Sequence, residues 1–158
     1  MQNKISVKKI TISGLVIALY IVIMYLTQSF AFGQYQIRIA TSFYATAAVY
    51  PFLIVPLGFA NFLSNTLMGG LGLPDMIGGL IAGIITASLC YYLRKINIYL
   101  AALPILLVPT LLVPIWLSYL LNIPYLALVV SIGIGQIIPA IMGVIIIKYL
   151  EKYKEKLK

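Results

Sequence analysis

The stretch 74–95, PDMIGGLIAGIITASLCYYLRK, decides the fold class. It opens with Pro74 and Asp75, continues as a run of apolar and small residues, and closes on Arg94 and Lys95. A run of about 20 such residues has the length of a membrane-spanning helix. Proline is tolerated in the first turn of a helix, so we expect the helix to begin at Pro74. The basic pair at the other end indicates the cytoplasmic side of the membrane.

The composition of the whole chain indicates a membrane protein. The 158 residues are 63% hydrophobic and 9% charged, whereas soluble domains are about 45–50% apolar and about 25% charged. The length suffices for about five or six spans with short connections, so we expect a single integral-membrane domain over residues 1–158. Beside apolar spans, the net charge of +8 indicates contact with anionic headgroups of the lipid bilayer and not with nucleic acid.

The basic residues predict the topology. Ten of the eleven lie at the start of the chain, in one turn and in the tail. Because basic residues collect on the cytoplasmic side, we predict an all-α, polytopic membrane protein with six transmembrane helices and both termini cytoplasmic, in the cell membrane. The predicted spans are 10–27, 39–55, 57–68, 74–93, 99–121 and 125–149. The ten basic residues are Lys4, Lys8, Lys9, Arg94, Lys95, Lys148, Lys152, Lys154, Lys156 and Lys158.

The fifth predicted span contains Pro104, Pro109 and Pro114 at five-residue intervals. Each proline removes one backbone donor, so this helix is not expected to be regular. Broken helices often border the ligand in transporters. The alternative is that Pro104 lies in the first turn and the other two only bend the helix around its neighbours.

The residues needed for catalysis are scarce. The chain has no histidine, a single cysteine and no Gly-Lys pair, which excludes a P-loop. Its acids are Asp75, Glu151 and Glu155, and the last two lie in the tail. With no paired carboxylates near the membrane and no histidine to activate a nucleophile, we expect no enzyme activity, no metal and no cofactor.

Arg38 departs from the basic pattern because it follows the first predicted outer loop, 28–37, which is rich in amides and aromatics. A charge in this position marks a candidate site. Asp75 shares the outer side, either as an ion-pair partner of Arg38, as a cap of its own helix, or as part of a pocket. Polar and aromatic residues predicted at this level suit a planar, hydrogen-bonding heterocycle, although helix contact or boundary placement is the alternative for each. The candidates are Gln34, Tyr35, Gln36, Arg38, Thr41, Tyr44, Asn65, Asp75, Trp116, Tyr119 and Gln136.

Small residues at helical spacing predict close helix contacts. Gly79, Gly83 and Ala87 form such a face in the fourth span, where we expect packing within the chain. Gly14 and Ala18 form another in the first span, where packing within the chain and docking of another protein are both open.

Four stretches together resemble a known family: FGQYQIRI (32–39), GGLGLPDMIGGL (69–80), LRK (93–95) followed by LAALP (100–104), and LSYLLNIP (117–124). Their order is similar to that of the QueT-like family of substrate-capture (S) components of energy-coupling factor (ECF) transporters. The resemblance implies six helices with cytoplasmic ends and an S subunit that binds a vitamin or queuosine precursor from outside. It also implies docking on an ECF transmembrane subunit with two ATPases, through Gly14 and Ala18.

Three positions depart from the family pattern, which has acids where this chain has Thr41, Trp116 and Gln136. Burying a cation without a partner costs several kcal/mol, so we expect a neutral ligand such as a deazapurine base, its nucleoside or another aromatic molecule. The hypothesis assigns gating to the loop through Arg38, orientation of a donor to Asp75, and ring stacking to Trp116 and Tyr119. A self-sufficient secondary transporter or channel and a non-transport membrane scaffold are the alternatives.

Overall fold

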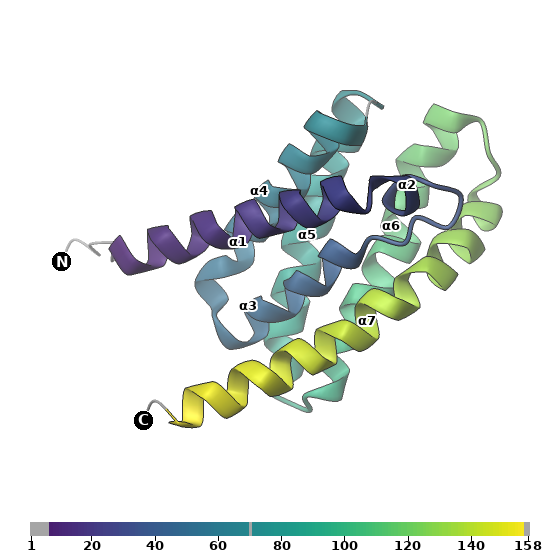
Figure 1. Ribbon diagram of the computed structural model, residues 1–158. Helices are drawn as coiled ribbons and strands as arrows, with labels where there is room; N and C mark the ends of the chain where they lie inside the picture. The colour runs from purple at the N-terminus through teal and green to yellow at the C-terminus, as the bar shows by residue number, and fades with distance from the viewer. Residues whose placement is uncertain (1–6, 70, 157–158) are drawn as a thin grey trace.

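The computed structural model describes residues 7–69 and 71–156, and the regular elements of these residues are helices (Figure 1). Lys4, Gly70 and Lys158, which enter the predictions above, lie outside the described residues, and the side chains of Lys154 and Lys156 are not described. The elements are α1 (Val7–Leu26), α2 (Gln28–Ala31), η1 (Ile39–Ala45), α3 (Thr46–Val49), η2 (Pro51–Leu53), α4 (Ile54–Ser64), η3 (Asn65–Gly69), α5 (Leu73–Arg94), η4 (Tyr99–Ala102), α6 (Leu103–Leu121) and α7 (Tyr125–Lys156).

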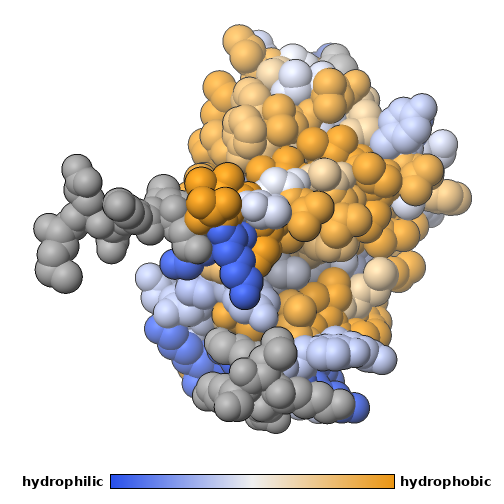
Figure 2. All heavy atoms as spheres, turned by 60° about the vertical axis from the view of Figure 1, so that its left-hand side comes forward, coloured by the Kyte–Doolittle hydropathy of each residue, from blue (hydrophilic) through white to orange (hydrophobic). Residues whose placement is uncertain are grey.

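Within the described residues, five helical segments are long and apolar enough to cross a membrane, and they overlap five of the predicted spans. Their outward faces are apolar, as Figure 2 shows over most of the visible surface. On α6 the exposed apolar residues recur every four positions, the spacing of a single helix face. A bilayer would cover this face. Its residues are Leu103, Leu107, Leu111, Ile115 and Tyr119.

The predicted span 39–55 is not one long helix. It consists of the 3₁₀ helix η1, the single turn α3 and the short η2, and its apolar helical part, Ile39–Val49, is shorter than a spanning helix. Thr41 and Thr46 each donate a side-chain hydrogen bond to the carbonyl three residues earlier, which suits the tighter 3₁₀ winding. Tyr50 precedes Pro51 and has φ −126° and ψ 83°, because proline disfavours the α conformation in the residue before it.

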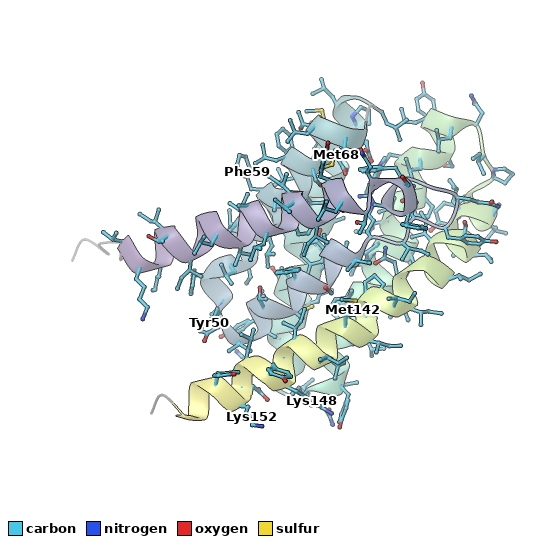
Figure 3. All side chains as sticks on the ribbon, viewed as in Figure 1. Tyr50, Phe59, Met68, Met142, Lys148 and Lys152 are labelled. Carbon is cyan, nitrogen blue, oxygen red and sulfur yellow. The ribbon has the colours of Figure 1, made fainter. Side chains whose placement is uncertain are left out.

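Both ends of the described chain lie at one end of the bundle, together with the connection between α5 and η4 (Figure 1). Hydrophilic residues gather there in Figure 2, and Figure 3 places Lys148 and Lys152 there, away from Met68. At this end Arg94 forms an ion pair with Glu151 of α7, with 2.7 Å between Nε and Oε1, and donates from Nη1 to the carbonyl of Ala48 at 3.3 Å. We call this set the inner clamp, since it ties α5, α7 and α3 together.

α4 and α5 cross with their backbones in contact. A Cβ on Gly83 would lie 2.9 Å from the Cα of Gly58, and one on Gly58 would lie 3.0 Å from the carbonyl oxygen of Leu80. Contact this close is possible only between glycines, as at small-residue crossings in membrane proteins. The predicted packing of the Gly79–Gly83 face within the chain is confirmed.

The proline-rich span consists of the 3₁₀ turn η4 followed by one α-helix, α6, which is not interrupted at its inner prolines. Pro104 lies in the first turn, where its missing donor is not needed, and Pro109 and Pro114 are buried inside the helix. This placement agrees with the alternative in which Pro104 belongs to the first turn and the other two prolines lie within the helix.

Candidate functional site

The loop between α2 and η1, which the predicted topology places outside and which we call the outer loop, is attached to α7. The Ser131 hydroxyl donates to the carbonyl of Gln34, and the amide of Gln136 donates from Nε2 to the carbonyl of Gln36 at 3.3 Å. A Cβ on Gly135 would collide with the carbonyl oxygen of Tyr35, so the loop backbone lies directly on the helix.

Gln36 has a left-handed backbone, with φ 45°, and its N–H donates to the carbonyl of Gly33 at 3.1 Å. This tight turn directs the chain back into the bundle, where Arg38 follows. The side chain of Gln36 is buried, whereas Tyr35 is about half exposed and lines neither pocket described below.

A narrow polar pocket lies beneath this loop, with a cavity volume of about 10 Å³, roughly the space of one water molecule. Gln136 lies 11 residues into α7, about 16 Å from its outer end at 1.5 Å per residue, so the pocket reaches towards the middle of the bundle. Its lining combines a guanidinium, amides and hydroxyls with apolar walls. The lining residues are Gln36, Arg38, Thr41, Tyr44, Asn61, Ala82, Thr86, Pro109, Val113, Ile132 and Gln136.

A second, more open pocket adjoins the first beside the loop, with a cavity volume of about 290 Å³. Gln36 lines both pockets and therefore lies between them. The remaining walls come from the loop, the outer end of α6 and the first turns of α7. The lining residues are Phe32, Gly33, Gln34, Gln36, Leu121, Ile123, Ala127, Leu128 and Ser131.

Arg38 is buried, with 5% of its surface exposed. Its Nε donates to the carbonyl of Ala31 at 3.3 Å and its Nη1 to Oδ1 of Asn65 at 3.2 Å, while the guanidinium lies 4.9 Å from the centre of the Phe32 ring. Guanidinium carries five N–H donors, and Nη2 makes no hydrogen bond within the described residues. Arg38 thus reaches the pocket with donor capacity left over.

No ion pair joins Arg38 and Asp75 within the described residues, so that alternative is wrong. Asn65 connects them instead: its Oδ1 accepts from Arg38, and its Nδ2 donates to the backbone carbonyl of Asp75 at 3.0 Å. The capping alternative is also wrong, because Gly72 is the N-cap of α5 and no side chain caps it.

Asp75 is 1% exposed and lines neither pocket. Its Oδ1 accepts from Nε1 of Trp116 at 3.0 Å, and its Oδ2 has no hydrogen-bond partner. A Cβ on Gly69 would lie 2.9 Å from Oδ2, so this carboxylate is held against the end of η3.

Trp116 and Tyr119 do not share a pocket wall. The Trp116 ring lies on Gly78, where a Cβ would be 2.7 Å from Cε2, while Tyr119 is 82% exposed on the outward stripe of α6. Residues three apart differ by about 60° around a helix, and the boundary between the buried and outward faces falls between these two. The structure brings neither residue into the pocket with Arg38.

Of the remaining candidates, Thr41, Tyr44 and Gln136 line the pocket. The single hydroxyl proton of Thr41 is shared between the carbonyl of Arg38 at 2.7 Å and Oε1 of Gln136 at 3.0 Å. Sequence reasoning missed Asn61 and Thr86, which line it from α4 and α5. Asn61 could have been predicted from its position one helical turn before the candidate Asn65, which places both side chains on one side of the helix. The described residues contain no group of three or more histidine, cysteine, aspartate or glutamate side chains that could hold a metal.

A family model described as QueT transporter matches residues 10–152. The chain belongs to this family. It is accordingly a multi-pass membrane protein with a role in transport, which fits its apolar surfaces and its polar interior pocket. The searches of curated proteins and of solved structures returned no match.

Proposed function

We propose that this QueT-family protein is the S subunit of an ECF-type importer and captures a small, uncharged aromatic heterocycle from outside the cell. The polar pocket beneath the outer loop carries the proposal, because it lies inside a bundle with an apolar surface. Guanidinium, amide and hydroxyl groups among apolar walls suit a planar, hydrogen-bonding ring better than a sugar or a bare ion.

The topology in this proposal has six crossings and places the inner clamp in the cytoplasm. η1 and α3 form the short crossing, since seven 3₁₀ and four α residues reach about 20 Å. The loop and η2 complete the passage across a hydrocarbon core of about 30 Å.

Single cysteines introduced in a Cys90→Ala background test this topology. Gln34→Cys should react with an impermeant maleimide from outside, and Asn97→Cys should react only after permeabilisation. The reverse pattern would overturn the orientation.

The charge of the substrate is inferred from the lining, which contains no carboxylate. Thr41 and Gln136, at positions where the family resemblance implies acids, are hydrogen-bonded to each other. A cationic ligand would therefore be buried near Arg38 without a countercharge, which is unfavourable by several kcal/mol. We expect 7-cyano-7-deazaguanine to bind more tightly than 7-aminomethyl-7-deazaguanine.

In this proposal the energy for transport comes from other subunits, and these subunits dock on an exposed face of α1. Gly14 has open space where a Cβ would be, and Ala18 is exposed. The buried residues of α1, Tyr20 and Met24, lie near its other end. Small residues on an exposed helix face allow another helix to approach closely, which suits docking on an ECF transmembrane subunit carrying two ATPases.

Uptake into proteoliposomes tests the proposed function. The chain alone should bind 7-cyano-7-deazaguanine without accumulating it, and uptake should require the ECF module and ATP. Ala18→Leu should keep binding and lose uptake, whereas Leu15→Met, a change at an exposed neighbour of similar size, should keep both. Uptake by the chain alone would favour the self-sufficient transporter. Absence of binding to any heterocycle would favour the scaffold.

A further inference from the structure

The side-chain amide of Asn61 in α4 is hydrogen-bonded through its nitrogen, Nδ2, and not through its oxygen, Oδ1, within the described residues. Its Nδ2 donates to the carbonyl of Gly79 on α5 at 2.9 Å. A carbonyl can only accept, so this bond fixes which end of the amide faces α5. Oδ1 is then the atom of Asn61 that has hydrogen-bonding capacity left.

Oδ1 of Asn61 is buried and has no hydrogen-bond partner among the described residues. The residue is 5% exposed and lines the polar pocket. Among the hydroxyls in the lining, Thr86 donates to the carbonyl of Ala82 at 2.7 Å. The Tyr44 hydroxyl lies close to Asn61 and 3.3 Å from the hydroxyl of Tyr20, a pair in which either oxygen can be the donor. A buried acceptor without a donor is unfavourable, and a ligand N–H would remove that penalty.

Arg38 supplies the complementary group in the same pocket. Its Nη2 is unused while Nε and Nη1 are bound to Ala31 and Asn65. Asn65 is the C-cap of α4 and the first residue of η3, four residues after Asn61, so the two side chains lie on one face of the helical segment. The pocket therefore offers a donor near its outer end and an acceptor about one turn deeper.

We propose that Asn61 determines substrate specificity: its Oδ1 accepts an N–H of the substrate while Nη2 of Arg38 donates to an acceptor of the same molecule. This inference rests on the proposed function and narrows its substrate class. The substrate is an uncharged heterocycle that carries both a carbonyl and a ring N–H, as a lactam does. A ring that offers acceptors alone leaves Oδ1 of Asn61 unpaired and binds weakly.

Two probes that differ at the lactam nitrogen test the proposal: 7-deazaguanine and 1-methyl-7-deazaguanine. Their dissociation constants are measured with the full chain in lipid nanodiscs. The wild type should bind the parent about 10- to 100-fold more tightly than the methylated probe, the factor expected for leaving a buried polar group unpaired. A ratio below threefold overturns the proposal without any variant.

The variant Asn61→Leu separates the hydrogen bond from the bulk of the methyl group, because leucine keeps the size of the side chain and removes the acceptor. Binding of the parent should weaken about 10- to 100-fold and the ratio between the probes should fall below threefold. An unchanged ratio would mean that only steric exclusion operates, and would overturn the proposal. Thr110→Val is the matched control, since Thr110 bonds within its own helix and does not line the pocket.

The outcomes separate the two proposals. Equal binding of both probes by the wild type, with uptake that depends on the ECF module, refutes the role of Asn61 and leaves the S-subunit function intact. Binding of neither probe, with no uptake of any heterocycle, refutes both.

Discussion

The two ends of the bundle each bring an arginine and an acid together, but in different ways. At the inner clamp, Arg94 meets Glu151 directly. At the outer end, Arg38 and Asp75 are both almost fully buried and are joined only through Asn65. A direct pair leaves little hydrogen-bonding capacity for another molecule. At the separated pair, Oδ2 of Asp75 is buried without a hydrogen-bond partner among the described residues, and the hydrogen bonds of Arg38 to those residues come from Nε and Nη1 and not from Nη2.

This difference indicates different roles for the two ends. The inner clamp is half-buried and joins three elements, as a structural contact does. Buried charges that remain only partly satisfied are unfavourable for stability alone and are typical of binding sites. We therefore expect changes at the outer arginine to affect ligand binding and changes at the inner arginine to affect stability.

The largest expected effect is that of Arg38→Leu. Removing the buried donor should weaken binding of 7-cyano-7-deazaguanine by more than about 100-fold, or about 3 kcal/mol. Loss of the buried charge offsets part of the lost hydrogen bonding, so the melting temperature should change much less than the affinity. Isothermal titration calorimetry on the purified chain measures the binding. Comparable loss of affinity in Arg94→Leu would remove the distinction between the two ends.

The next effect is that of Trp116→Phe, which removes the hydrogen bond to Oδ1 of Asp75. Both carboxylate oxygens of Asp75 would then lack a side-chain partner, and the protein should lose about 1–3 kcal/mol of stability. Thermal unfolding in detergent measures the change. Tyr119→Phe is the control and should shift stability by less than about 0.5 kcal/mol, since Tyr119 lies on the outward face. Equal shifts would mean that the Trp116–Asp75 bond contributes nothing.

Breaking the inner clamp with Arg94→Leu should have a smaller effect, about 1–2 kcal/mol of stability, because the pair is partly exposed. Substrate affinity should stay within about twofold. A double-mutant cycle with Glu151→Leu measures the coupling. Strictly additive losses would show that Arg94 and Glu151 do not stabilise each other.

The smallest expected effect is that of Gln136→Glu, which gives the outer end a carboxylate facing the pocket. The affinity for 7-aminomethyl-7-deazaguanine relative to the cyano compound should rise about fivefold, or about 1 kcal/mol, by charge attraction. Competition binding with both compounds measures the ratio. If the ratio does not change while affinity for both falls, the new carboxylate pairs with Arg38 instead, and the outer end becomes a copy of the inner one.

The span boundaries could be predicted because length, hydropathy and basic residues act locally along the chain. The break in the second span could not, since it depends on hydroxyl bonds within η1 and on Tyr50 before Pro51. The separation of Trp116 from Tyr119 depends on which side of α6 faces its neighbours, and three-residue spacing alone does not determine that side.

The polar pocket was predictable in part. Arg38 and Thr41 stood out as polar groups near the predicted outer end and Gln136 as one about midway along the sixth span, and all three line the pocket. Asn61 gave little signal, since one amide in an apolar helix is as consistent with helix contact as with ligand binding. The structure distinguishes the two ends of its amide: Nδ2 donates to the carbonyl of Gly79 in a helix contact, and Oδ1 is the atom proposed to accept from the substrate.

The contact between Gly58 and Gly83 has a consequence for how a molecule gains access to the bundle. Helices whose main chains touch have no compressible side chains between them. We therefore expect α4 and α5 to move together as one unit when the pocket opens. Wider access would then require displacement of α6, or of α7 with its attached loop, which form the rest of the pocket wall.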